Sequence, residues 1–197
     1  MKVFIVYCHP CDDSLTRCIL DSFIRGLESS GHTHIVSDLY KMNFRTDMSE
    51  EEYRREAFYR RDLPVPEDVF AEQEKINSSD AIAFVYPVFW SEAPAKLVGW
   101  FDRVWTFGFA YGENRTMKQL EKALVLVSAG NTLEYFEQTG LGTAIEKVIL
   151  DDRLFDRVKK KEMIIFDGTS REKEEREKNR ENHLNRAFGA GAGFFSL

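Results

Sequence analysis

The 197-residue sequence is poor in cysteine and has no surplus of positive charge. Its three cysteines are an odd number, so a disulfide scaffold is not expected, and a reducing, cytoplasmic location is the simpler interpretation. Lysine and arginine total 27 against 33 aspartate and glutamate, which gives a net charge of −6. Because nucleic acids and anionic membranes bind clustered positive charge, neither is an expected partner.

Long apolar runs are also missing. The longest mostly apolar stretch, residues 81–90, is about half the length that crosses a bilayer, and it contains a proline. The first apolar run, residues 1–7, is too short for a secretory signal and passes directly into polar residues. The length and composition therefore predict a single domain over residues 1–197, with one core and no membrane insertion.

What the sequence does contain is an alternation of strands and helices. Residues 2–7 form an apolar run without polar alternation, which is typical of a strand buried on both faces of a parallel sheet. Further strands are predicted at residues 34–39, 81–86, 123–128 and 163–166. Helical spacing is found after Ser14, at 67–77, after Pro94, at 142–150 and at 171–187. This order predicts an α/β fold with a doubly wound parallel sheet and helices on both faces.

Three segments fit this alternation less well. Residues 41–66 are charged and aromatic, and we expect a partly helical excursion there. The basic run 159–161 is interpreted as a solvated helix end before the last strand. Residues 171–197 are predicted to form a charged, salt-bridged helix followed by a Gly/Phe-rich tail, which either packs on a partner or is mobile.

The loop after the first strand is the first candidate site. Ligands of open α/β sheets bind outside the carboxyl ends of the strands. His9, Ser14 and Thr16 offer an imidazole, hydroxyls and free N–H groups at a helix start, where a phosphate can sit. Asp12 and Asp13 would repel an anion unless they turn away. A well-capped helix without a ligand is the alternative interpretation.

Two more loops follow strands at the same edge of the predicted sheet. The loop at residues 86–95 is rich in aromatics, and a flat redox cofactor is held by such an apolar wall with backbone donors nearby. The loop at residues 128–135 has small residues that allow close approach of the backbone, and one tyrosine. The candidate residues of these loops are Pro87, Val88, Phe89, Trp90, Ser128, Ala129, Gly130 and Tyr135.

The order of the motifs resembles the NAD(P)H:quinone oxidoreductases, the DT-diaphorase and flavodoxin-like group. The sequence has His-Pro-x-x-x-Ser-Leu-Thr from His9, Tyr-Pro-x-x-Trp-x-x-x-Pro-Ala-x-Leu-x-x-Trp-Phe-Asp-Arg-Val from Tyr86, and Gly-Phe-Ala-Tyr from Gly108. The resemblance covers roughly residues 2–135. It implies a flavodoxin-like fold with strand order 2-1-3-4-5 and a non-covalent FMN or FAD. It also implies NAD(P)H as co-substrate, a quinone or similar acceptor, and a homodimer with the site at the subunit interface.

The resemblance also implies roles for the matching residues. The flavin phosphate or pyrophosphate would be bound by His9, Ser14, Leu15 and Thr16. The isoalloxazine ring would be bound by Pro87, Val88, Phe89 and Trp90. Its pyrimidine side would be closed by Ser128, Ala129, Gly130 and Tyr135, of which Tyr135 is the catalytic candidate. The chain departs from the family at three positions: Thr16 replaces a common asparagine, Glu92 a common glycine and Leu141 a relay histidine.

Other functions fit parts of the sequence. Cys8 and Cys11 form a C-x-x-C motif between a strand and a helix, as in thiol–disulfide oxidoreductases. Adding Cys18 and a histidine gives a zinc site by count, but no second closely spaced ligand pair is present, so no metal is predicted. A flavin-bound regulatory or interaction subunit of an ion-efflux system is the third alternative, because Leu141 and Glu92 suit a weakly catalytic protein.

Overall fold

A computed structural model describes residues 1–169 and 173–195, which form one parallel sheet with helices around it. The strands are β1 (Lys2–Tyr7), β2 (Thr33–Asp38), β3 (Ala81–Pro87), β4 (Leu120–Ser128) and β5 (Val158–Phe166). Their order in the sheet is β2-β1-β3-β4-β5, and each neighbouring pair is parallel. The predicted flavodoxin-like strand order is confirmed.

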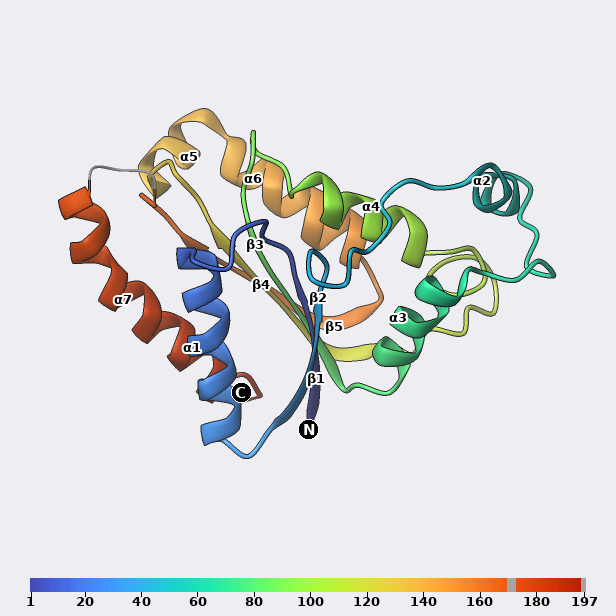
Figure 1. The fold of residues 1–197 in the computed structure, drawn as a ribbon, viewed down its shortest axis with the longest axis horizontal. Coiled ribbons are helices and arrows are strands. Elements are labelled where there is room, and N and C mark those ends of the chain that lie inside the picture. Colours follow the sequence, from blue (N-terminus) through green and yellow to red (C-terminus); the bar gives the residue numbers. More distant parts are fainter. Residues whose placement is uncertain (170–172, 196–197) are drawn as a thin grey trace.

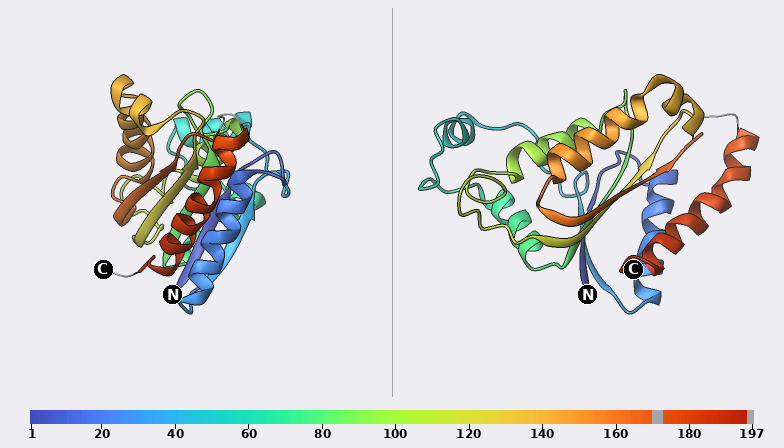
Figure 2. Two further views of the ribbon diagram at one scale, coloured as in Figure 1. Left: turned by 90° about the vertical axis from the view of Figure 1, so that its left-hand side faces the viewer. Right: turned by 180° about the vertical axis from the view of Figure 1, so that it is seen from behind.

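Helices cover both faces of the sheet (Figures 1 and 2). One face is covered by α1 (Leu15–Ser29) and α7 (Lys173–Ala192). The other is covered by α3 (Glu67–Asn77), α4 (Ala95–Val104) and the run from α6 (Leu141–Glu146) into the π-helix η1 (Lys147–Leu154). The short α5 (Leu133–Thr139) follows β4, and α2 (Glu50–Ala57) lies at the end of the molecule farthest from α7.

The sheet separates two apolar cores. In β1, Phe4 and Val6 face α3 and α4, while Val3 and Ile5 face α1 and α7, because successive side chains of a strand point to opposite faces. All four side chains are fully buried. The apolar run that predicted a doubly buried strand therefore supplies both cores.

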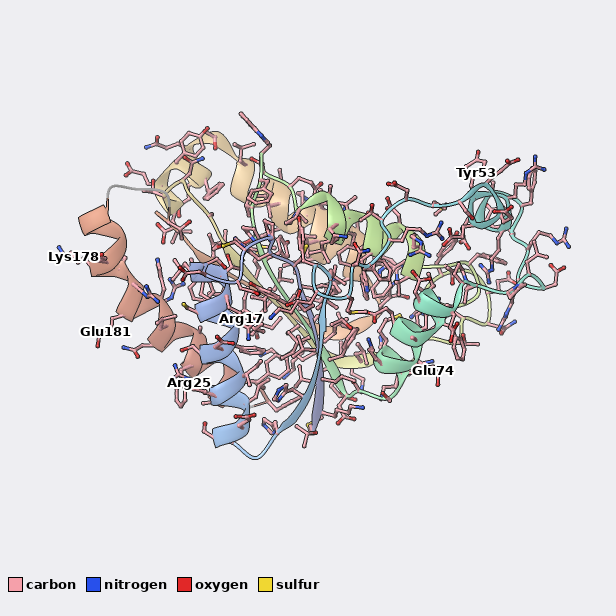
Figure 3. The ribbon with its side chains drawn as sticks, in the orientation of Figure 1. Arg17, Arg25, Tyr53, Glu74, Lys178 and Glu181 are labelled. Atoms are coloured by element: carbon pink, nitrogen blue, oxygen red, sulfur yellow. The ribbon has the colours of Figure 1, made fainter. Side chains whose placement is uncertain are left out.

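Close contact between α1 and α7 depends on two glycines. A Cβ added at Gly26 would lie 2.2 Å from the carbonyl oxygen of Phe188, and one added at Gly191 would lie 2.2 Å from that of Phe23. Both distances are far below van der Waals contact, so only glycine allows the two backbones to approach this closely. Figure 3 labels Arg25 on α1 and Glu181 on α7, which mark the course of this helix pair.

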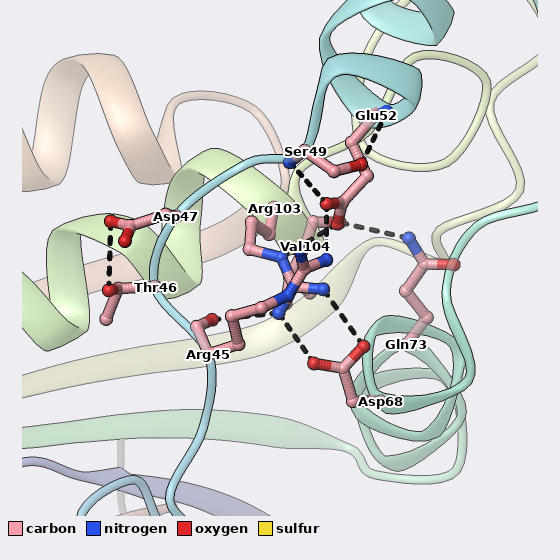
Figure 4. A network of polar contacts seen from close by, with 9 residues as sticks. All are labelled: Arg45, Thr46, Asp47, Ser49, Glu52, Asp68, Gln73, Arg103 and Val104. Carbon is pink, nitrogen blue, oxygen red and sulfur yellow. Dashed lines mark hydrogen bonds and ion pairs between the residues drawn. The ribbon is translucent and has the colours of Figure 1, made fainter.

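On the opposite core, segments are joined by buried charges. We call residues 45–66 the α2 arm. Arg103 of α4 is fully buried, and its Nε donates to Glu52 Oε1 of the arm at 2.8 Å. Its Nη1 donates to the Arg45 carbonyl at 2.8 Å, and both Nη atoms donate to the Asp68 carboxylate of α3 at 2.6 and 3.0 Å (Figure 4). Arg103 therefore ties the arm to α3 and α4.

The ionisation of this cluster follows from its contacts. Burial alone would raise the pKa of Glu52, but hydrogen bonds from the Ser49 N–H and Arg103 outweigh it, and the pKa is lowered. The hydrogen bond from Arg103 also lowers the pKa of Asp68. Burial opposes the charge of Arg103, yet its two carboxylate partners raise its pKa overall. All three groups are therefore charged at neutral pH.

The basic run 159–161 is part of β5, so its interpretation as a helix end is wrong. β5 begins at Val158, where it pairs with Leu120 of β4, and both strands begin earlier than predicted. An edge strand tolerates charged side chains, because one of its sides is free of neighbours. Lys159 extends to Glu121 of β4, with 2.7 Å between Nζ and Oε1.

The end of the chain also differs from its prediction. α7 continues to Ala192, and Phe194 behind it is 1% exposed and packs edge-on against Phe23, with 5.7 Å between ring centroids. Phe194 and Phe195 are thus packed on their own chain instead of forming a mobile tail, while Phe188 remains 40% exposed. Parts of the predicted helix and tail, at residues 171–172 and 196–197, lie outside the described residues, as does residue 170. Among the helices of the described part, none is long and apolar enough to span a bilayer.

Candidate functional site

A cavity of about 610 Å³ opens at the carboxyl ends of β1, β3 and β4. It receives residues from all three predicted loops and from α7 near the end of the chain. The predicted residues that line it are His9, Ser14, Leu15, Thr16, Pro87, Val88, Phe89, Ser128 and Gly130. The structure therefore brings together most of the residues that the three loops contributed to the predicted site.

The first wall of the cavity is the N-terminus of α1. The Ser14 hydroxyl accepts from the Arg17 N–H at 3.1 Å, which caps the helix. Within the described residues, the N–H groups of Leu15 and Thr16 have no protein acceptor. The Thr16 hydroxyl lies 2.7 Å from that of Ser128, which joins the first loop to the third. Free N–H groups and the helix dipole suit an anion at this wall.

The acidic residues of this loop behave differently from each other. Asp12 turns toward Arg17 and Lys41, with 3.9 and 3.3 Å between the charged atoms, and does not line the cavity. Asp13 does line it. His9 is held by the loop backbone, with its Nδ1 2.9 Å from the Cys11 nitrogen. Thus only one of the two carboxylates lies where it would repel an anion.

The second wall ends in a tight hairpin that we call the Trp90 hairpin (residues 89–92). Phe89 and Glu92 exchange two backbone hydrogen bonds of 2.9 Å. Trp90 and Ser91 adopt φ values of 51° and 61°, left-handed conformations that cost non-glycine residues about 1 kcal/mol or more each. Phe89 lines the cavity, whereas Trp90 is fully exposed at the tip and does not.

Glu92, which follows the tip, points away from the cavity. Its Oε1 accepts from the Ala93 N–H at 2.8 Å and lies 3.4 Å from Nη1 of Arg153 in η1. Glu92 lines a separate depression over α4. Its negative charge is therefore paired on the far side of the hairpin.

The third wall is built from small residues of the β4 loop. Ser128 and Gly130 line the cavity, while Ala129 is buried behind them and donates its N–H to the Phe166 carbonyl at 2.9 Å. Tyr135 lies on α5, is 42% exposed and does not line the cavity. The structure thus leaves the catalytic role of Tyr135 a prediction.

Four lining residues were not predicted from the sequence: Asp13, Thr169, Glu177 and Arg180. Glu177 and Arg180 lie on α7, and Nη2 of Arg180 is 3.2 Å from Sγ of Cys18 on α1. The stretch that contains them was interpreted as a surface helix. Their i, i+3 spacing places both on one helix face, but only the α1–α7 contact shows that this face meets the cavity.

The thiols of the C-x-x-C motif are placed unequally. Cys8 is fully buried, and burial raises the pKa of its thiol to about 12, while Cys11 is exposed. A redox dithiol needs an accessible thiolate, so the position of Cys8 argues against this alternative. Among the described residues no cluster of potential metal ligands is found.

The chain is similar to several known proteins. The family model described as "Flavodoxin-like fold" matches residues 1–188. A ribosyldihydronicotinamide dehydrogenase-like protein from Penicillium crustosum is 30% identical over 175 residues, covering 76% of this chain and 65% of that protein. The human ribosyldihydronicotinamide dehydrogenase (quinone) is 31% identical over 159 residues, covering 71% of this chain and 68% of that protein. The chain thus spans about two thirds of the length of these curated relatives.

One solved structure is similar over the whole chain. The NAD(P)H:quinone oxidoreductase from Methanothermobacter marburgensis is 45% identical, with a TM-score of 0.94, and the match covers 100% of this chain and 98% of that one. The similarity includes α7 and the segment after it, where no motif was found in the sequence.

Proposed function

The chain belongs to the family of flavodoxin-like fold that includes the NAD(P)H:quinone oxidoreductases, and we propose that it is a flavin-dependent oxidoreductase of this kind. It would transfer hydride from NAD(P)H through bound FMN or FAD to a quinone or similar acceptor. The observation that carries this proposal is the cavity at the strand ends, where the three loops converge. A cytoplasmic location, expected from the cysteine count, is part of the same proposal.

The residues around the cavity fit a flavin. The free N–H groups of Leu15 and Thr16, together with the hydroxyl of Ser14, would hold its phosphate at the start of α1. Phe89 and Val88 would provide the apolar wall for its ring system, and Gly130 allows close approach on the third side. A bound flavin supplies the two-electron chemistry between NAD(P)H and the acceptor.

The chain itself would bind, orient and exclude water. Backbone N–H groups that the strand ends hold in place would stabilise negative charge on a bound flavin without reorganising. We propose that Tyr135 closes the side of the cavity next to Gly130 with its hydroxyl. Trp90 and Ala129 would complete the site, Trp90 from the hairpin tip and Ala129 by fixing the backbone behind the cavity.

We also propose a homodimer with the site at the subunit interface. Apolar side chains are strongly exposed near the site and on the α2 arm: Trp90 is fully exposed, and Phe58 and Tyr59 are more than 60% exposed. Figure 3 labels Tyr53 on α2, at the end of the molecule opposite α7. Exposed aromatics of this kind are typical of interfaces. Light scattering at micromolar concentration tests the dimer, and a monomer would contradict it.

A second candidate is a flavin-bound regulatory or interaction subunit of an ion-efflux system. The observation that favours it is Leu141, at the start of α6, in the place where the resemblance calls for a relay histidine. An aliphatic side chain cannot move a proton. A flavin-loaded protein that shows no turnover of NAD(P)H with any acceptor would support this candidate and contradict the enzyme.

The test of the proposed function is flavin binding, followed by turnover. We expect the purified protein to retain FMN or FAD, shown by the visible flavin spectrum, and mass spectrometry to identify which one is bound. Thr16→Val should weaken flavin binding about tenfold, because it removes a hydroxyl beside the free N–H groups. The matched control is Thr33→Val, the same change at the opposite end of the sheet. A protein that binds neither flavin would contradict the proposal.

A further inference from the structure

We propose that the ion pair between Glu92 and Arg153 is a latch that positions the Trp90 hairpin for the electron acceptor. This inference rests on the proposed function, and it assigns positioning roles to two residues that do not line the cavity themselves. The hairpin connects the two places, because Phe89 at its base lines the cavity and Glu92 at its other end carries the ion pair.

The hairpin needs an external anchor. Trp90 and Ser91 both hold left-handed φ values, which non-glycine residues adopt only when their surroundings impose them. The two backbone hydrogen bonds between Phe89 and Glu92 close the turn, but they do not fix its orientation relative to the sheet. The fully exposed side chain of Trp90 contributes no packing within the chain. The orientation must therefore come from the residues at the base.

Glu92 supplies the contact that can fix the orientation of the hairpin. One oxygen, Oε1, accepts from the Ala93 N–H at 2.8 Å and lies 3.4 Å from Nη1 of Arg153. The first contact fixes the carboxylate against its own backbone, just before α4 begins. The second fixes it against η1. The hairpin is thereby connected to a separate helix.

Arg153 is held firmly on its own side. Its side chain is only 16% exposed, and its guanidinium lies over the ring of Phe101, 5.0 Å from the ring centroid. Its carbonyl oxygen accepts from the indole Nε1 of Trp105 at 2.6 Å. It lies in the last turn of the π-helix η1, a helix type often found at functional sites. Arg153 therefore presents its charge to Glu92 from a fixed position.

The latch should determine how well an acceptor is bound, because Trp90 is a fully exposed aromatic at the tip of a hairpin whose base lines the cavity. Planar acceptors bind to aromatic faces by stacking, and stacking requires a fixed ring orientation. A released hairpin would still allow Phe89 to line the cavity, so flavin binding should change little. The expected signature is a higher KM for the acceptor with unchanged flavin affinity.

The first experiment needs no flavin. Amide hydrogen exchange is measured at Phe89 and Glu92, whose N–H groups close the hairpin, in flavin-free protein. Glu92→Gln keeps the acceptor for the Ala93 N–H but removes the charge, and we expect exchange to become about two- to fivefold faster, the range of a partly exposed ion pair. Lys159→Gln, which removes the ion pair with Glu121, is the matched control and should leave both rates unchanged.

The second experiment tests whether the pair acts as a unit. Arg153→Gln should accelerate exchange as much as Glu92→Gln does, and the double variant should be no faster than either single variant. Arg153→Lys keeps the charge and should restore part of the protection. Additive effects in the double variant, or unchanged exchange in both single variants, would overturn the latch.

The third experiment uses the flavin-loaded protein. Glu92→Gln should raise the KM for a quinone about two- to fivefold while the flavin dissociation constant stays within about twofold of the unmodified protein. Faster exchange with an unchanged KM would overturn the positioning role. If the protein binds no flavin, the proposed function fails, whereas the exchange experiments still decide whether the latch exists.

Discussion

The two faces of the sheet are covered by different kinds of contact. On one face α1 and α7 meet through backbone at Gly26 and Gly191, and the residues below them are apolar. On the other, the α2 arm is fastened by Arg103, whose guanidinium is surrounded by carboxylates and a carbonyl. The first contact depends on shape, and the second depends on charge. The helices that line the cavity, α1 and α7, belong to the first face.

The two regions should lose stability for different physical reasons. Apolar packing with glycines loses stability when volume is added, because backbone atoms cannot move aside separately. A buried ion cluster loses stability when one partner is removed or neutralised, because the remaining charges stay buried without compensation. The two regions should therefore respond to different changes.

The largest loss of stability is expected from Arg103→Ala. Removing the arginine leaves Glu52 and Asp68 without their shared cation, which should lower the free energy of unfolding by about 3 kcal/mol. Arg54→Ala is the control, because Arg54 forms an exposed pair with Glu50 in the same arm and should cost less than about 0.5 kcal/mol. Urea denaturation measures both. Equal costs for the two variants would contradict the role of the buried cluster.

An intermediate effect is expected on the apolar face from Gly191→Ala. The added Cβ would meet the Phe23 carbonyl at 2.2 Å, so α7 must move away from α1, at a cost of about 1–3 kcal/mol. Gly189→Ala is the matched control in the same helix, because nothing lies within 4 Å of its added Cβ. It should raise stability by about 0.5–1 kcal/mol. Thermal unfolding that ranks the two variants the other way would refute the close contact.

A smaller loss of stability is expected at low pH. Acid should weaken the charged face and leave the apolar face unchanged, so it distinguishes the two without a mutation. Glu52 and Asp68 have pKa values below their ordinary 4.5 and 3.8, so the unfolded chain binds protons more readily than the folded one. Their contribution is present above these ordinary values and is lost as the pH falls through the lowered ones. The loss is smaller than in Arg103→Ala, because protonated carboxyls still form hydrogen bonds.

NMR during an acid titration can observe this separation. As the pH falls, resonances of the α2 arm should broaden or move at a higher pH than those of Phe23 and Leu27, which lie on α1 against α7. Glu52→Gln should reduce this difference in pH. If both faces respond together in the unmodified protein, the arm has no acid sensitivity of its own.

The same contrast explains how much of the fold could be predicted from the sequence. The positions of the strands and of the three loops along the chain depend on local signals, such as the apolar run at residues 81–86 and the cap at Ser14, and these signals predicted them. The order of the strands in the sheet depends on contacts between distant segments, and it was predicted from the family resemblance. The start of β5 was missed, because Lys159 and Lys160 are polar and only pairing with β4 shows that they belong to a strand.

Only the cavity residues in loops that directly follow strands could be predicted from the sequence. Arg180 and Glu177 enter the cavity from α7, about 170 residues along the chain from the loop at His9, and their position depends on the glycine contact between α1 and α7. The direction in which the Glu92 side chain points could not be predicted from the sequence either. It is set by the ion pair with Arg153, which lies in a π-helix that no local pattern indicates. Contacts between distant segments decide these positions.

The lysines of β5 have a consequence for assembly. β5 is one of the two outer strands of the sheet, and Lys159 and Lys160 project exposed charges from it. A second sheet that added itself to this edge would bring equal charges together, which is unfavourable. The edge is thus protected from continuous sheet formation between molecules. Concentrated solutions should therefore resist strand-by-strand aggregation at this side.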